Sequence, residues 1–275
     1  MHTIFYFTGT GNCLQVAREL AARFPEDVNL IRVCSDTLHL AKEKYSGRIG
    51  IVYPTYSNNM PIMLKNFLEE LQVEDTPDNY IYTVCVHGGM PGRVHVFLES
   101  IFRRKGTPVN GAFLVRLPHN GIVIFDAEQE EKQRLWFEGL PARVQEIVDA
   151  VMAETPVTCG NTSPSPKAIK ALGLKLPPGP PPDEQIAPNP IFDPQKREKE
   201  FFADEGCIGC GTCVSVCPAD NIALEDGHPV WKGHCESCMA CFQWCPAECV
   251  QFADQTQSRR RYHNPNIKLN EIQLR

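Results

Sequence analysis

Apolar positions in the first half of the chain follow two alternating patterns. Residues 3–7 form an unbroken apolar run with aromatic and β-branched side chains, which is typical of a buried strand. Residues 11–24 instead place apolar side chains every three or four positions, which predicts an amphipathic helix. Both patterns recur further along the chain. The expected strands are residues 3–7, 28–33, 48–53, 80–86 and 112–115, and the expected helices are residues 11–24, 61–71, 93–102 and 126–152, the last with a possible break at Pro141.

Strands and helices in this order predict an α/β fold with a doubly wound, five-stranded parallel sheet. Ligands of such sheets bind beyond the carboxyl ends of the strands. The first of these ends carries a short polar loop made of Thr8, Gly9, Thr10, Gly11, Asn12 and Cys13. Amide groups at a helix N-terminus, flanked by hydroxyls, form an anion site, and glycines permit close approach. The loop is neither a complete dinucleotide fingerprint nor a Walker loop. A plain turn before a capped helix is the alternative.

Cysteines are concentrated in two runs near the C-terminus. Residues 207–218 and residues 235–246 both have the C-x-x-C-x-x-C-x-x-x-C-P spacing of bacterial two-cluster ferredoxins. Three closely spaced thiolates can surround one iron–sulfur cube, whereas the fourth reaches the neighbouring cube. The pattern therefore predicts two 4Fe-4S clusters with crossed ligation. One would be held by Cys207, Cys210, Cys213 and Cys245, and the other by Cys235, Cys238, Cys241 and Cys217.

Zinc and disulfides are the two alternatives for these cysteines. Zinc sites use four ligands per ion, usually as two pairs, and have no use for a doubled three-plus-one pattern. Thiols this dense without a secretory signal argue against disulfides.

The two cysteine runs belong to an internal repeat in which residues 206–224 overlie residues 234–252. Cys249 falls opposite Asn221, which cannot be a thiolate ligand. We therefore expect Cys249 to pack beside Val250 rather than to bind a cluster. The repeat predicts a small pseudo-symmetric domain with edge strands at residues 200–203 and 250–253 and little else. A domain of this size would depend on its clusters for much of its stability.

Composition and charge exclude several other classes of protein. The 275 residues are enough for two domains, and 43% hydrophobic with 22% charged residues is ordinary for a globular protein. A net charge of −6 argues against nucleic acid as a partner. No run of about twenty apolar residues occurs, so no membrane span is expected. The start of the chain lacks signal-peptide features, and the scattered remaining cysteines suit a reducing compartment, so a cytoplasmic protein is predicted. These cysteines are Cys13, Cys34, Cys85, Cys159 and Cys249.

The first loop, residues 7–12, resembles the flavin phosphate loop of flavodoxins. With the two cysteine runs, the chain resembles the flavodoxin–ferredoxin fusions called EFR1-family ferrodoxins over nearly all of residues 1–265. This resemblance implies a flavodoxin-like doubly wound five-stranded parallel sheet, followed by a small α+β bacterial two-cluster ferredoxin domain. The implied cofactors are FMN and two 4Fe-4S clusters. FMN rather than FAD also fits a loop whose donors surround a single terminal phosphate.

The resemblance implies that three loops hold the FMN. Besides residues 8–13, these are a second loop of Pro54, Thr55, Tyr56, Ser57, Asn58 and Asn59, and a third of His87, Gly88, Gly89 and Met90. We expect Tyr56 either to stack on the flavin ring or to be a half-buried loop aromatic. His87 would tune the charge near the flavin or have no role. The family usually has Thr or Ser where this chain has Cys13, and a thiol is a weaker phosphate donor. Residues 117–121 and 261–265 resemble two further family segments, and Asn120 would fold over the flavin.

Proline marks the boundary between the two halves. Residues 177–194 contain eight prolines, which predicts a semi-rigid polyproline strap, with an unstructured spacer as the alternative. The expected domains are residues 1–155 (FMN-binding), 156–197 (linker), 198–255 (ferredoxin) and 256–275 (tail). Three consecutive arginines, residues 259–261, are expected to contact the acidic body or an acidic redox partner.

Three functions fit these features. The first is an electron-transfer flavoprotein that passes electrons between FMN and two 4Fe-4S clusters and on to a redox partner protein or a small-molecule acceptor. The second is an FMN-dependent reductase of a small substrate, supplied with electrons through the clusters. The third is a redox or oxygen sensor with labile clusters. A homodimer is compatible with all three, and direct oxidation of a nicotinamide is not expected without a dinucleotide fingerprint.

Overall fold

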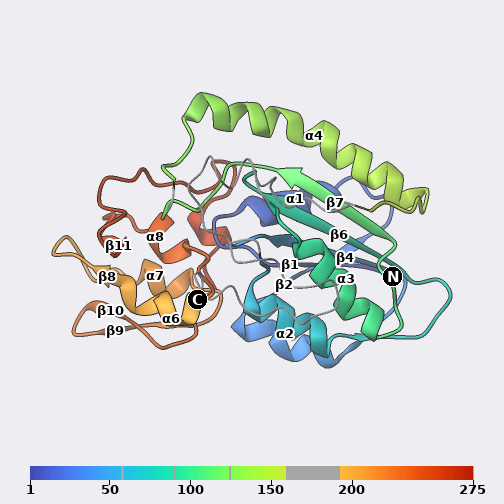
Figure 1. Cartoon of the computed structure of the whole chain (residues 1–275), viewed down its shortest axis with the longest axis horizontal. Coiled ribbons are helices and arrows are strands. Elements are labelled where there is room, and N and C mark those ends of the chain that lie inside the picture. The colour runs from blue at the N-terminus through green and yellow to red at the C-terminus, as the bar shows by residue number, and fades with distance from the viewer. Residues whose placement is uncertain (57–58, 90, 124, 159–192, 275) are drawn as a thin grey trace.

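The computed structural model describes residues 1–56, 59–89, 91–123, 125–158 and 193–274. Its N-terminal part is a five-stranded parallel sheet with the strand order β2-β1-β4-β6-β7 (Figure 1). The strands are β1 (His2–Tyr6), β2 (Val28–Arg32), β4 (Arg48–Pro54), β6 (Tyr80–His87) and β7 (Gly111–Arg116). The predicted doubly wound sheet is confirmed. Two further strands, β3 (Lys44–Tyr45) and β5 (Gln72–Val73), form a separate parallel pair.

Helices cover both faces of the sheet. Helices α1 (Asn12–Ala21) and α4 (Glu130–Met152) bury their apolar sides with one set of strand residues, among them Ile4 and Val84. Helices α2 (Ile62–Glu70) and α3 (Val94–Arg104) pack with the opposite set, which includes Phe5 and Ile51. Strand residues alternate between the two cores because successive side chains of a strand point to opposite faces.

Helix α4 differs from its prediction at two points. It runs through Pro141 without the possible break, since Leu140, Val144 and Val148 all bury against the sheet and hold both halves in line. It also begins at Glu130 rather than at residue 126. The carboxylate of Asp126 instead accepts hydrogen bonds from the backbone amide and the guanidinium of Arg260. The contact between Asp126 and Arg260, which are far apart in the sequence, thus takes the place of the first predicted turn of α4.

The C-terminal part contains short elements around the cysteine runs. They are α6 (Pro194–Arg197), η2 (Glu198–Glu200), β8 (Phe201–Ala203), α7 (Thr212–Ser215), β9 (Ile222–Glu225), β10 (His228–Trp231), α8 (Ala240–Gln243), β11 (Val250–Phe252) and η3 (Leu269–Glu271). Strands β8 and β11 pair in antiparallel fashion where edge strands were predicted.

The hairpin of β9 and β10 was not predicted. Its turn consists of Asp226 and Gly227, which both have a positive φ, of 49° and 80°. An Asp-Gly pair between two short apolar runs is a recognised hairpin signal, so the sequence did carry the information.

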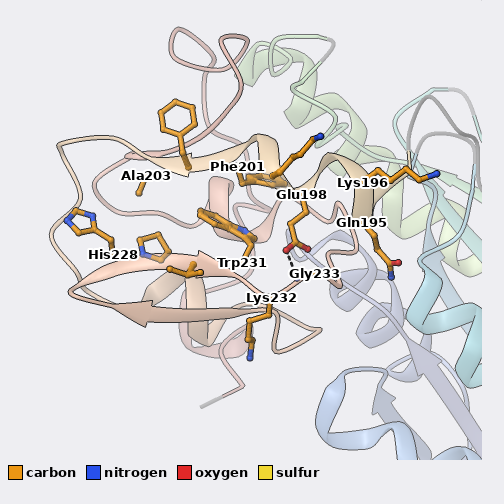
Figure 2. A pocket seen from close by; sticks show the side chains of 13 residues that line it. Gln195, Lys196, Glu198, Phe201, Ala203, His228, Trp231, Lys232 and Gly233 are labelled. Carbon is orange, nitrogen blue, oxygen red and sulfur yellow. Dashed lines mark hydrogen bonds between the residues drawn. The ribbon is translucent and has the colours of Figure 1, made fainter.

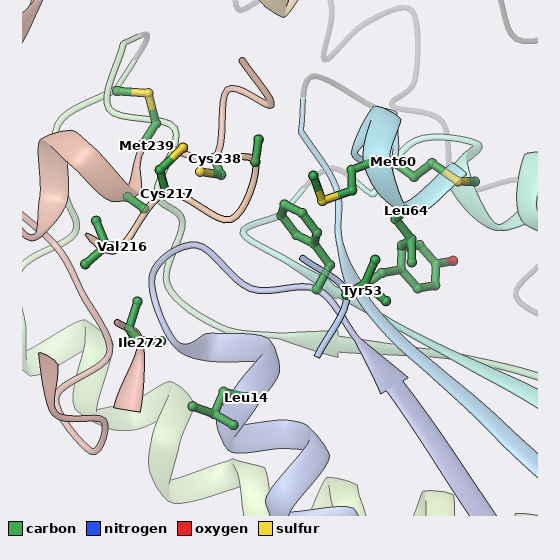
Figure 3. Close-up of a cluster of buried hydrophobic side chains, with 14 of the residues drawn as sticks. Leu14, Tyr53, Met60, Leu64, Val216, Cys217, Cys238, Met239 and Ile272 are labelled. Carbon is green, nitrogen blue, oxygen red and sulfur yellow. The ribbon is translucent and has the colours of Figure 1, made fainter. Parts of the chain in front are cut away.

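The two parts share one hydrophobic core, part of which Figure 3 shows. Leu14 of α1 and Tyr53 of β4 belong to the same buried cluster as Val216, Met239 and Ile272 of the C-terminal part. In Figure 1 the C-terminal elements lie beside one end of the sheet. Within the described residues, no helix combines the length and apolar character needed to cross a membrane.

Candidate functional site

Three loops follow the carboxyl ends of β1, β4 and β6, which are adjacent in the sheet. The first is residues 8–13, where Gly11 has a φ of 98° and its amide donates to the Thr8 hydroxyl over 3.1 Å. The second runs from Pro54, and its Tyr56 exchanges backbone hydrogen bonds with Asn59. Residues 87–89 begin the third. Ser57, Asn58 and Met90 lie outside the described residues.

Protein covers the first loop. A Cβ on Gly9 would come within 2.6 Å of the carbonyl oxygen of Cys238, and one on Gly11 within 3.0 Å of the Asn264 side chain. The indole Nε1 of Trp244 donates to the Gly9 carbonyl over 3.1 Å. These contacts show why glycine is required here: a side chain on either residue would separate the C-terminal part from the loop.

The C-terminal tail holds the end of this loop. The Oδ1 atom of Asn12 accepts from the Tyr262 hydroxyl over 2.7 Å and from the Asn264 side chain over 3.1 Å. Its Nδ2 atom donates to the Pro118 carbonyl. The backbone amide of Asn264 also donates to the Thr10 carbonyl. Asn12 therefore joins the loop to the tail and to the segment after β7.

The second cysteine run reaches the second loop as well. Asn120 donates from Nδ2 to the Cys238 carbonyl over 3.1 Å, so the segment that resembled a flavin cover contacts the C-terminal part. Burial raises the pKa of Tyr56 well above its usual range, and the charge of the Cys238 thiolate adds to the rise. The carboxylate of Glu236 accepts from the amide of Met63 at the start of α2, and burial raises its pKa to about 7.

Two features of the loops bear on flavin binding. The Thr55 hydroxyl is buried and has no hydrogen-bond partner in the described part of the chain, so a bound polar group could satisfy it. Burial lowers the pKa of His87 to about 4, with Arg116 adding to the effect, and its Nδ1 accepts from the Gly89 amide. His87 is therefore neutral near pH 7 and adds no charge to the site.

Four cysteines surround a cavity on the far side of the C-terminal part. Cys207, Cys210, Cys213 and Cys245, which we call the outer group, line one small pocket. The pKa of Cys213 is raised to about 11, mainly by burial and in smaller part by the neighbouring charges of Cys245, Cys210 and Cys207. Four thiols around one pocket are the ligand set of a 4Fe-4S cluster. Over the described residues, no three His, Cys, Asp or Glu side chains are placed to share one metal ion.

The remaining four cysteines of the two runs lie toward the sheet. This inner group consists of Cys217, Cys235, Cys238 and Cys241, all nearly buried. Burial raises the pKa of Cys241 well above its usual range, and the charges of Cys235, Cys238 and Cys217 add to that rise. The charged neighbours of Cys213 and of Cys241 lie mainly within their own groups, and Cys213 is also near Cys241. The crossed ligation itself stays a prediction.

Cys249 lies at the edge of the outer group. Its Sγ is 3.4 Å from the Sγ of Cys245, and it lines the same cavity. It is also 3% exposed next to Val250. The repeat correctly placed it in a packed position but did not indicate its contact with a second thiol.

The two groups differ in access to solvent. Cys210 is exposed and Cys207 is half-buried, whereas each inner-group cysteine is at most 9% exposed. Ile208, between the two accessible cysteines, is 70% exposed. The outer group therefore faces the surroundings, and Cys238 of the inner group contacts Gly9 of the first loop.

Comparison with known proteins supports the assignment of the C-terminal part. Residues 206–250 match the family model of the 4Fe-4S dicluster domain. A stretch of 54 residues is 43% identical to one component of the Na(+)-translocating ferredoxin:NAD(+) oxidoreductase complex of Acetobacterium woodii. That match covers 19% of this chain and 16% of the component, so the chain spans about a sixth of the length of this curated relative.

Solved structures resemble the N-terminal part at low identity. Rubredoxin oxygen:oxidoreductase from Desulfovibrio gigas has a TM-score of 0.38 and 17% identity, covering 55% of this chain and 36% of that one. The flavodoxin of Streptococcus pneumonia TIGR4 has a TM-score of 0.38 and 14% identity, covering 56% and 99%. At such scores the fold assignment depends on the strand order itself. The chain thus combines a flavodoxin-like sheet with a C-terminal 4Fe-4S dicluster domain.

Proposed function

We propose that this chain is an electron-transfer iron–sulfur flavoprotein of the flavodoxin–ferredoxin fusion type, in which FMN at the three loops exchanges electrons with two 4Fe-4S clusters. The observation that carries the proposal is the contact between Cys238 of the inner group and Gly9 of the first loop. Because a Cβ on Gly9 would be only 2.6 Å from the Cys238 carbonyl, the two sites adjoin without an intervening side chain.

The positions of the two thiol groups support a direction for the path. A redox partner can approach the outer group, because Cys210 and Ile208 are exposed. The inner group lies between the outer group and the first loop. When bound, FMN can hold one or two electrons and each cluster one, which lets the chain join one-electron and two-electron partners.

The residues of the chain hold this arrangement together. Among the hydrogen bonds that cross the junction between the two parts, Trp244 donates to Gly9 and Asn120 donates to Cys238. Thr55 has a buried hydroxyl available to a flavin group. The close approach of Gly9 and Cys238 suits electron transfer within one molecule.

The proposal is tested by anaerobic purification followed by analysis of iron, sulfide and flavin. We expect about eight iron and eight sulfide per chain and a released flavin that mass spectrometry identifies as FMN. Rapid reduction of the clusters should then reduce the flavin at a rate independent of protein concentration. A flavin-free protein, a released FAD, or a rate that rises with protein concentration would refute the proposal.

A further inference from the structure

A buried carboxylate lies beside the inner group. Glu198, in η2 just before β8, is 5% exposed. Its Oε2 accepts from the backbone amide of Cys235 over 2.8 Å and from Asn221 Nδ2 over 3.0 Å, and its Oε1 accepts from the Gly233 amide (Figure 2). All three partners are neutral N–H donors, and no cation forms a salt bridge with Glu198 within the described residues. A carboxylate accepts all three of these bonds through its two oxygens.

The internal repeat provides a comparison within the same molecule. Cys207 of the outer group is the counterpart of Cys235, and its amide donates to the neutral backbone carbonyl of Asp204 over 3.1 Å. Asn221, which links Glu198 to the inner group, has Cys249 as its counterpart at the outer group. The two cysteine runs have the same spacing but different surroundings. The inner group has the buried carboxylate of Glu198 in its hydrogen-bond network, whereas the outer group has the Asp204 carbonyl and the Cys249 thiol at the equivalent positions.

We propose that Glu198 is a positioning residue that lowers the reduction potential of the cluster at the inner group below that of the cluster at the outer group. A fixed negative charge disfavours the addition of an electron nearby, and low solvent access strengthens the effect. The Cys235 amide is also directed to the carboxylate, so it is not free to donate to sulfur. The proposal rests on the proposed function, because it requires a cluster at each group.

Two kinds of local group act in the opposite direction: the guanidinium of Arg32, whose charge interacts with Cys238 and Cys217, and backbone amides. The amides of Asn221 and Ser237 donate to the sulfurs of Cys217 and Cys235, each over 3.3 Å, and such bonds favour the reduced state. The amides are neutral dipoles, whereas Glu198 carries a full charge in direct hydrogen-bond contact with the Cys235 amide, so its charge is expected to outweigh them. Glu198→Gln removes this charge and leaves Arg32 in place. An electron that exchanges between the two clusters would then reside mainly on the cluster at the outer group, from which a redox partner can accept it.

The experiment is an EPR-monitored redox titration of the anaerobically purified protein with dithionite. The cluster at each group takes up one electron, and dithionite is oxidised to sulfite. No bond forms or breaks at Glu198. The outer signal is identified by adding a gadolinium chelate, which enhances relaxation of the cluster nearer to solvent. In the wild-type protein we expect the inner midpoint to be the lower one. In Glu198→Gln we expect the inner midpoint to move to a more positive potential, so that the ratio of reduced to oxidised inner cluster at a fixed potential rises on the order of tenfold.

Glu200→Gln is the matched control, because it removes a carboxylate two residues away that is solvent-accessible and paired with Arg197. It should leave both midpoints unchanged. An unchanged inner midpoint in an intact Glu198→Gln protein, or an equal shift of both midpoints, would overturn the inference. If that variant fails to assemble, an inner midpoint above the outer one in the wild-type protein would also overturn it. Absence of both cluster signals would instead refute the proposed function.

Discussion

At the scale of single residues, neighbouring thiols decide which cysteines can share a cluster. Cys217 lies among the inner group although it belongs to the first cysteine run. Cys249 belongs to neither set of four, yet its Sγ lies 3.4 Å from that of Cys245. Proximity to a thiol group therefore does not by itself make a ligand, and substitution can separate the two roles.

We predict that Cys217→Ser loses the inner cluster, whereas Cys249→Ser keeps both. Iron and sulfide analysis after anaerobic purification should give about four of each for the first variant and about eight for the second. A full iron content in Cys217→Ser, or a deficit in Cys249→Ser, would contradict the crossed ligation.

His2 gives a second prediction, at the amino end of β1. Burial lowers its pKa from 6.5 to about 4, although its ring contacts Glu26 and the Tyr82 hydroxyl, each over 2.9 Å. The unfolded chain therefore binds a proton between these pH values that the folded chain does not. Stability is fully present above pH 6.5 and is lost as the pH falls toward 4, by up to about 3 kcal/mol. Urea unfolding across this range should show a flatter pH dependence for His2→Gln than for the wild type. Equal slopes for the two proteins would contradict this account.

At the scale of elements, the C-terminal tail fastens the two parts. Arg32 donates to the Ile272 carbonyl, and the amide of Leu274 donates to Ser215, so the tail contacts both parts. Arg260 and Arg261 contact the body of the protein, as one of the expectations for the arginine cluster stated. The Pro-rich segment, residues 177–194, was expected to hold the parts together. It lies outside the described residues except for Asp193 and Pro194, and packed surfaces and the tail join the parts in the described chain.

We predict that Asn264→Ala releases the tail from the first loop. The fully buried side chain of Asn264 donates to Asn12 and Gln15, and these acceptors would be left without it, at a cost of about 2 kcal/mol. Hydrogen exchange of residues 262–267 should become faster. The control is Asn266→Ala, because the exposed Asn266 side chain makes only a longer contact with Gln15, over 3.3 Å. Equal exchange in both variants would show that the Asn264 side chain does not hold the tail.

At the scale of the whole molecule, the junction between the parts determines how closely the inner group approaches the loops. This junction is continuous with the core of the sheet, since residues of both parts belong to one buried cluster. Electron transfer through it depends on distance, so a small separation of the parts should slow it.

We predict that Gly9→Ala slows electron transfer between the clusters and the flavin. The added methyl group would lie 2.6 Å from the Cys238 carbonyl and 2.9 Å from its Cβ, which forces the two parts to separate. Flash or stopped-flow reduction under anaerobic conditions should show a lower, concentration-independent rate at equal flavin content. Gly139→Ala is the control, because nothing lies within 4 Å of its Cβ position in α4 and alanine favours a helix. A wild-type rate in Gly9→Ala would show that the junction does not limit the transfer.

Local patterns in the sequence were sufficient to predict the strands of the sheet and its helices. Strand and helix periodicity depends on neighbouring residues only, so β1, β4 and β6 were found within a few residues of their ends. The cysteine spacing likewise indicated two sets of four, because a tight loop limits which thiols can share a centre. The hairpin at Asp226 and Gly227 was also within reach of the sequence through its turn residues.

Contacts between distant segments were decided only by the tertiary structure. No local pattern places Cys238 on Gly9, Asn264 beside Asn12, or Glu198 beside Cys235. The resemblance of the first loop predicted a phosphate cradle, yet its glycines also admit the C-terminal part, because the space around a residue depends on what folds against it. Sequence therefore determined the elements and the thiol groups, and the tertiary structure determined which group faces the loops and which buried charge lies beside it.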